Sequence, residues 1–149
     1  MTLRELIVTG LSVAALAACG GGEKKPPTVG ETKDFAAVCD KANDGKRVAV
    51  AGYLRLPEEV SRNILVLRLY NTDGFSGQPI GVSADFGSKP NQVEFLSKEY
   101  SDRDLKVHLA DGQVAGFRTK VRVSGDVYFP LVKAEFPCSL SNPLIELAK

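Results

Sequence analysis

Catalysis by a nucleophile or by general acid–base chemistry would need a suitably placed base, and the chain offers few candidates. His108 is the only histidine, and it lies between two apolar residues where we expect it on the outer side of a short strand. The Gly-Phe-Ser-Gly segment at 74–77 is one residue short of a nucleophile elbow. No fixed spacing pairs the acidic residues that glycoside hydrolysis would use, which are Asp85, Glu94, Asp102 and Asp104. We therefore expect no enzyme and no cofactor.

The first nineteen residues have the pattern of an export signal. Residues 1–5 include one arginine, residues 6–17 form an apolar run, and a Leu-Ala-Ala-Cys tetrapeptide ends at Cys19. A membrane-spanning helix needs about 20 apolar residues, so this shorter run predicts a signal peptide over residues 1–18. An ordinary secretory signal, cut after the second alanine, would fit the same pattern and leave the cysteine free.

All four positions of the tetrapeptide match the lipobox, and the segment resembles a bacterial lipoprotein signal. The resemblance implies that Cys19 opens the mature chain and carries diacylglycerol and an N-acyl chain, of the palmitate type. Several acyl chains anchor stably, at about 0.8 kcal/mol per buried methylene. Gly20 lacks the aspartate that retains enterobacterial lipoproteins in the inner membrane, which favours the periplasmic side of the outer membrane in a host with two membranes. Residues 19–33, rich in glycine at the start, predict a flexible tether.

Cys39 and Cys138 are the other two cysteines, and export would place them in an oxidising compartment. We expect them to form a disulfide, which would close a loop of roughly a hundred residues and contribute about 4–5 kcal/mol in the chain-entropy model. The alternative is a redox or metal pair. The sequence has no Cys-x-x-Cys motif and only one histidine as a nitrogen ligand, so we predict no metal.

Apolar residues alternate along much of residues 34–149, which predicts a mainly β domain. The expected strands are 47–56, 65–70, 80–86, 105–109 and 121–129, with a last edge strand at 140–147. Helical spacing predicts two short helices, one over residues 34–42 and one that starts at Pro90 and runs to Tyr100.

An internal repeat relates residues 47–57 to residues 120–130. The shared pattern is basic, Val, any, Val, small, Gly, any, aliphatic, any, apolar, Pro, with Gly52 and Gly125 in equivalent places. A glycine inside a strand normally weakens it, so the pair predicts two sharply bent strands, which close a small barrel. The alternative is two ordinary strands that share a common Val-x-Val-x-Gly pattern by chance.

This order of elements resembles the OB-fold, a five-stranded Greek-key barrel. Residues 45–52 and 119–125 look like the first and fourth strands of exported OB-fold proteins in the tRNA-anticodon-binding-like group, and the likeness covers Phe35 to Leu140. We therefore expect a small five-stranded OB-like barrel with one or two short helices. A fold does not carry a function with it.

If the valines and leucines of the strands face the interior, tyrosines and basic residues face outward. This candidate face comprises Tyr53, Arg55, Arg68, Tyr70, Lys120, Arg122 and Tyr128. The resemblance implies that oligonucleotides or oligosaccharides would lie there, because aromatic rings stack on bases or sugars and cations pair with phosphate or carboxylate. The alternative is an ordinary solvated strand face.

Composition narrows the function further. The 149 residues are 44% apolar and 25% charged, which fits one globular domain and excludes a disordered, collagen-like or multi-span membrane protein. A net charge of +1 provides no long-range field to attract nucleic acid. We expect a lipid-anchored, non-enzymatic envelope module that binds a protein partner or an envelope glycan. One alternative is an oligonucleotide-binding module, although an envelope protein seldom meets nucleic acid. The other is an unrecognised envelope hydrolase.

Overall fold

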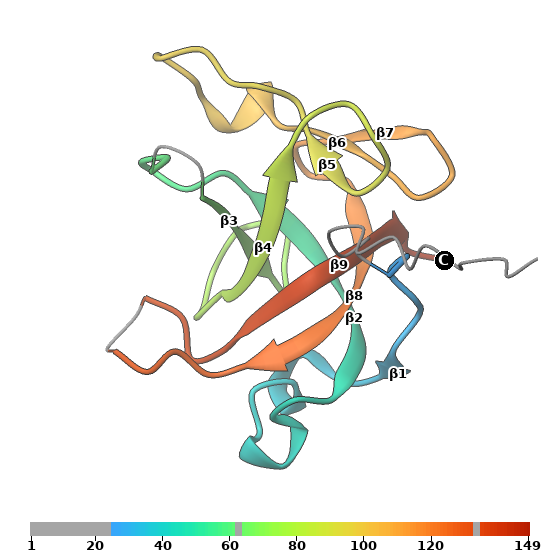
Figure 1. Cartoon of the computed structure of the whole chain (residues 1–149). Helices are drawn as coiled ribbons and strands as arrows, with labels where there is room; N and C mark the ends of the chain where they lie inside the picture. The colour runs from blue at the N-terminus through green and yellow to red at the C-terminus, as the bar shows by residue number, and fades with distance from the viewer. Residues whose placement is uncertain (1–24, 62–63, 133–134) are drawn as a thin grey trace, which may run out of the picture.

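Five long strands close into a barrel, which confirms the predicted mainly β, OB-like fold (Figure 1). The computed structural model describes residues 25–61, 64–132 and 135–149. The predicted signal peptide at 1–18 and Cys19 lie outside the described residues.

The barrel strands are β2 (Arg47–Arg55), β3 (Leu65–Tyr70), β4 (Ile80–Phe86), β8 (Lys120–Tyr128) and β9 (Ser139–Leu147). β2 pairs with β3 and β8, β3 pairs with β4, and β8 pairs with β9, all antiparallel. The parallel pair of β4 with β9 closes the ring. The prediction that residues 140–147 form an edge strand is therefore wrong, because β9 has a neighbour on both sides.

Four shorter strands extend the sheet. β1 (Glu31–Thr32) pairs in parallel with β2, so the chain already contacts the barrel within the segment assigned to the tether. β5 (Gln92–Val93) pairs in parallel with the end of β4. β6 (Lys106–His108) pairs antiparallel with β5, and β7 (Val114–Gly116) pairs antiparallel with β6. These three strands lie at one end of the barrel (Figure 1).

Neither predicted helix is present. In place of the first are two 3-10 turns, η1 (Phe35–Ala37) and η2 (Lys41–Asn43), because the extended Asp40 interrupts the segment and its carboxylate caps the second turn at the Ala42 amide. The prediction of a second helix from Pro90 to Tyr100 is wrong, because Asn91, its second residue, has a left-handed conformation (φ 64°) that does not continue a helix. The chain forms β5 instead, and the 3-10 turn η3 (Asp102–Asp104) lies between β5 and β6.

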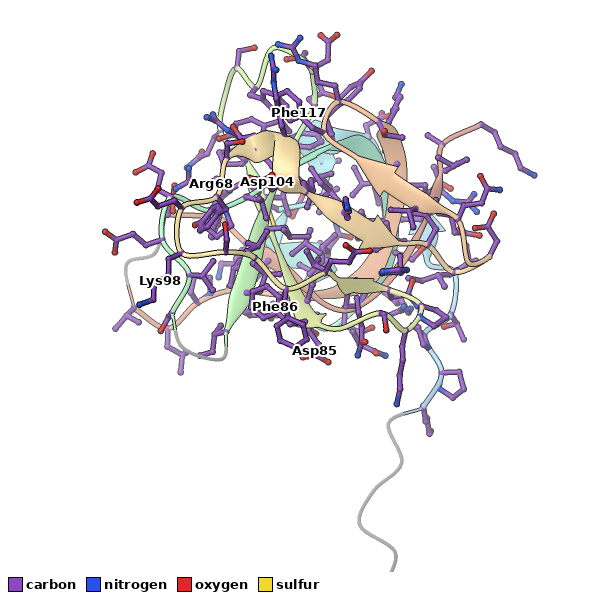
Figure 2. All side chains as sticks on the ribbon, turned by 90° about the horizontal axis from the view of Figure 1, so that it is seen from above. Arg68, Asp85, Phe86, Lys98, Asp104 and Phe117 are labelled. Atoms are coloured by element: carbon purple, nitrogen blue, oxygen red, sulfur yellow. A yellow bond between two sulfur atoms is a disulfide. The ribbon has the colours of Figure 1, made fainter. Side chains whose placement is uncertain are left out.

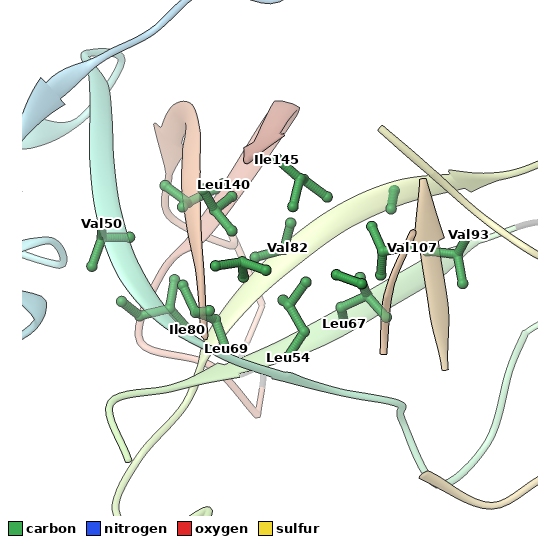
Figure 3. Packing of buried hydrophobic residues seen from close by; sticks show 14 of the residues in the cluster. Val50, Leu54, Leu67, Leu69, Ile80, Val82, Val93, Val107, Leu140 and Ile145 are labelled. Carbon is green, nitrogen blue, oxygen red and sulfur yellow. The ribbon is translucent and has the colours of Figure 1, made fainter. Parts of the chain in front are cut away.

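One hydrophobic core fills the barrel and continues into the end covered by β5 to β7 (Figure 3). The inward side chains of every barrel strand belong to it, as the alternation predicts, and so do Val93 and Val107 of the added strands. At the other end, Val38 and Cys138 are buried. The predicted disulfide between Cys39 and Cys138 is present, with the two Cα atoms 5.4 Å apart.

The two copies of the repeat are neighbours in the barrel. β2 and β8 run antiparallel, with Gly52 opposite Val121 and Gly125 opposite Val48. Close to Gly125, the register between β8 and β9 shifts. Both glycines are buried.

Candidate binding surface on the barrel

The outer face of β2 brings together four of the seven residues predicted to form the candidate face. Tyr53 lies opposite Tyr70 of β3 on one side and opposite Lys120 of β8 on the other. Arg55 follows two positions later on the same face. The alternation of the strands places these residues on one face of the sheet, although only 7% of Tyr70 is exposed.

Two phenylalanines from loops join this face, and the sequence analysis did not identify either of them as site residues. The Phe75 ring packs edge-on against Tyr70, with 5.4 Å between the ring centroids. Phe117 stacks on the other side of Phe75 at 5.4 Å, with the rings 22° from parallel. The Arg55 guanidinium lies 5.4 Å from the Phe75 centroid, and the Arg118 guanidinium lies 5.1 Å from that of Phe117. These five residues are the aromatic–basic cluster.

Two residues of this cluster have unusual backbone conformations. Phe75 and Arg118 both have a positive φ, of 54° and 64°, which non-glycine residues rarely adopt. The turn that holds Phe75 is closed by its amide, which donates to the Thr72 carbonyl at 3.1 Å. Such conformations cost about 1–3 kcal/mol and persist where the surrounding structure fixes them, often at functional sites. Phe75 and Phe117 remain half-buried, and Arg118 is exposed.

The cation at Arg55 is oriented by an acidic partner. Its Nε donates to Asp102 Oδ2 at 2.7 Å, and this hydrogen bond raises the pKa of the guanidinium. Asp102 sits in η3, whose first turn is closed by a reciprocal pair of hydrogen bonds between Ser101 and Asp104. Arg55 is thus held in place and partly neutralised, while Arg118 and Lys120 carry exposed positive charge.

Arg68, by contrast, is buried on the candidate face and has a structural role. Its guanidinium pairs with Glu135 at 2.5 Å and with Glu58 at 3.7 Å, and only 9% of the residue is exposed. Loss of both glutamates would leave this largely buried cation without a charge partner, which would destabilise the fold. Arg68 is therefore not available to a ligand in this structure.

Arg122 and Tyr128 also face outward, but they contact other parts of the barrel. The Arg122 guanidinium donates to Glu146 of β9 at 2.7 Å. The Tyr128 hydroxyl lies 2.8 Å from the Ser83 hydroxyl of β4. Both side chains are therefore engaged by barrel residues outside the aromatic–basic cluster.

Most of the side chains considered for catalysis are engaged by neighbouring groups. His108 Nε2 lies 3.2 Å from Glu94 Oε1, outside hydrogen-bonding geometry, and Lys106 is 3.6 Å from the same carboxylate. Asp102 holds Arg55, and Asp104 closes the η3 turn. Within 25–61, 64–132 and 135–149, no group of three or more His, Cys, Asp or Glu side chains is arranged to hold a metal ion.

Comparison with known proteins finds no family model and no curated protein that matches this sequence. The described part of the chain also contains no helix that is long and apolar enough to cross a membrane. The function must therefore be argued from the surface itself.

Proposed function

We propose that the protein is a lipid-anchored, non-enzymatic binding module of the bacterial cell envelope. The lipobox-like tetrapeptide that ends at Cys19 supports the anchor and the export route. The disulfide between Cys39 and Cys138 suits an oxidising compartment. On the likeness of residues 45–52 and 119–125, we further propose that the barrel belongs with the exported OB-fold proteins of the tRNA-anticodon-binding-like group.

The anchor has a direct test in the residue that would be acylated. Cys19→Ala should abolish processing and acylation, because the acyl chains are attached through the thiol and the new amino terminus of that residue. We expect the wild-type chain to fractionate with membranes, to incorporate labelled palmitate and to shift in mass, and the variant to lose the label and the mass shift. An unlabelled wild-type chain released as a soluble protein would contradict the anchor.

The ligand we propose for the aromatic–basic cluster is an envelope glycan that bears carboxylate groups. The observation that carries this proposal is the half-exposed stack of Phe75 on Phe117, with Arg55 beside one ring and Arg118 beside the other. Sugar rings stack on aromatic faces, and guanidinium groups pair with carboxylates. Lys120 adds an exposed ammonium group next to Tyr53. The cluster lies on an open face, which suits a polymer.

The binding test compares a phenylalanine of the cluster with a phenylalanine outside it. We expect Phe117→Ala to weaken binding of soluble, carboxylate-bearing cell-wall glycan fragments about tenfold, since a stacked ring is worth about 1–3 kcal/mol. Phe95→Ala, which removes an 80% exposed ring outside the cluster, should leave the affinity unchanged. Calorimetric titration at low salt measures both, with circular dichroism to check the fold.

Other ligands give distinct results in the same titration. Binding of a single-stranded oligonucleotide that weakens steeply with salt would replace the glycan by nucleic acid. Equal affinity of the wild-type protein and Phe117→Ala for the glycan would remove the cluster as its site and leave a protein partner as the next candidate.

A further inference from the structure

A groove on the barrel surface, away from the stacked Phe75 and Phe117 rings, has an apolar floor and acidic residues at its rim. It is a groove of about 770 Å³ between the loop after β2, the end of β4 and the segment that follows β5. Its apolar part consists of Val60, Phe86, Phe95, Leu96 and Tyr100. In Figure 2, Phe86 and Asp85 lie well apart from Phe117, while Glu58 and Tyr100 at the near side of the groove also line a smaller hollow beside Arg55.

The aromatic floor of the groove is unusually exposed. Phe95 stacks on Phe86 with the ring centroids 5.5 Å apart and the rings 14° from parallel, yet Phe95 is 80% exposed. Phe86 is half-buried and packs against the barrel core from its outer side. One face of a rigidly backed aromatic pair is therefore open to solvent, which is typical of a site that receives a partner.

The charges around this floor are mainly negative. Glu58 and Glu59 line the groove at the β2 side and Asp85 at the end of β4, and Lys98 is the single basic residue among the described residues of its lining. The Glu58 side chain is 86% exposed and reaches Arg68 only at 3.7 Å. Burial, and then the charge of Glu59, raises the pKa of the Tyr100 hydroxyl, which donates to the Pro57 carbonyl at 2.5 Å. Glu58 and Glu59 therefore place two carboxylates beside the apolar floor of the groove.

We infer that this groove binds a basic segment of a partner protein, in which arginine or lysine side chains alternate with apolar ones. A guanidinium or ammonium group over the exposed Phe95 ring would gain a cation–π contact, and the rim carboxylates would pair with it. The apolar side chains of the same segment would cover Leu96 and Val60. Neither an anionic glycan nor a nucleic acid fits, since the rim would repel both. The inference is independent of the glycan proposal, because it concerns a different surface and a ligand of opposite charge.

The test uses a short amidated peptide of arginine and leucine and a control peptide with glutamate in place of arginine. We expect the arginine peptide to bind the purified protein saturably at low salt, with amide chemical-shift changes centred on Phe86 and Phe95, and the glutamate peptide not to bind. Phe95→Ala should weaken binding at least about fivefold, and the double variant Glu58→Gln with Glu59→Gln should do the same. Leu131→Ala, which truncates a fully exposed apolar side chain elsewhere, should have no effect.

The four replaced residues are exposed, and Arg68 keeps its closer partner Glu135 when Glu58 is replaced, so circular dichroism should show an intact fold in each variant. A loss of binding by such a folded variant would report on the groove. Absence of saturable binding by the arginine peptide would overturn the inference, and so would equal affinity of the wild-type protein and Phe95→Ala. Self-association that disappears in Phe95→Ala, without peptide binding, would instead make the groove an interface between two copies of this chain.

Discussion

Replacing Cys39 and Cys138 together by alanine is expected to lower the free energy of unfolding by about 4–5 kcal/mol. The two residues are 99 positions apart, so the disulfide restricts the unfolded chain over most of the domain. In the chain-entropy model, the loss of so long a crosslink costs about 4.7 kcal/mol. A domain of this size is stable by only about 5–15 kcal/mol in total. We therefore expect the double variant to be close to unfolding at physiological temperature.

Urea denaturation without reductant measures this effect. The wild-type protein treated with reductant serves as a control, since it loses the same crosslink without any change of side chain. Both should show the same lowered midpoint. If the wild-type chain, denatured without reductant, gave two titratable thiols from these positions, or if the double variant unfolded at the wild-type midpoint, the crosslink would not carry this stability.

The barrel strands were predictable because their buried residues alternate with a period of two. Residues 65–70 of β3 match their predicted bounds, and β8 matches within one residue at each end. β9 was harder to interpret, because Pro143 and the left-handed Asn142 interrupt its alternation, and nothing in the pattern shows that a terminal strand pairs on both sides. The helix prediction at residues 90–100 failed for a related reason: the positive φ of Asn91 arises from tertiary contacts, including the hydrogen bond from the Ile145 amide to its side chain.

The candidate face was predictable only in part. Alternation shows on which side of a strand a residue lies, and it placed Tyr53 and Arg55 on the outer face. It could not show that Tyr70 on the same face is buried, with the Phe75 ring packed against it. It cannot show that Glu135, far away in the sequence, would cover Arg68. Phe75 and Phe117 lie in loops without periodicity, so only their placement beside glycines in polar segments could have indicated exposed rings.

The two glycines of the repeat are required because neighbouring strands approach them closely. Neither has a positive φ, so their backbone conformation is open to other residues. A Cβ atom on Gly52 would lie 2.5 Å from the Tyr70 carbonyl oxygen and 2.9 Å from Leu69 Cδ1. On Gly125, it would lie 2.8 Å from Leu140 Cβ. The contacts are with backbone or with atoms near it, which cannot move without displacing a neighbouring strand.

Gly52→Val and Gly125→Val should each therefore lower the free energy of unfolding by about 3 kcal/mol or more, because overpacking forces the barrel strands apart. Thermal and urea unfolding followed by circular dichroism measure the change. Gly74→Ala is the matched control, since a Cβ atom there would meet nothing within 4 Å and its φ is not positive, and it should leave stability unchanged or slightly raised. If either valine variant melted at the wild-type temperature, the strands could separate at no cost at that position. The repeat would then be a sequence pattern common to ordinary strands, and the barrel would not need it in order to close.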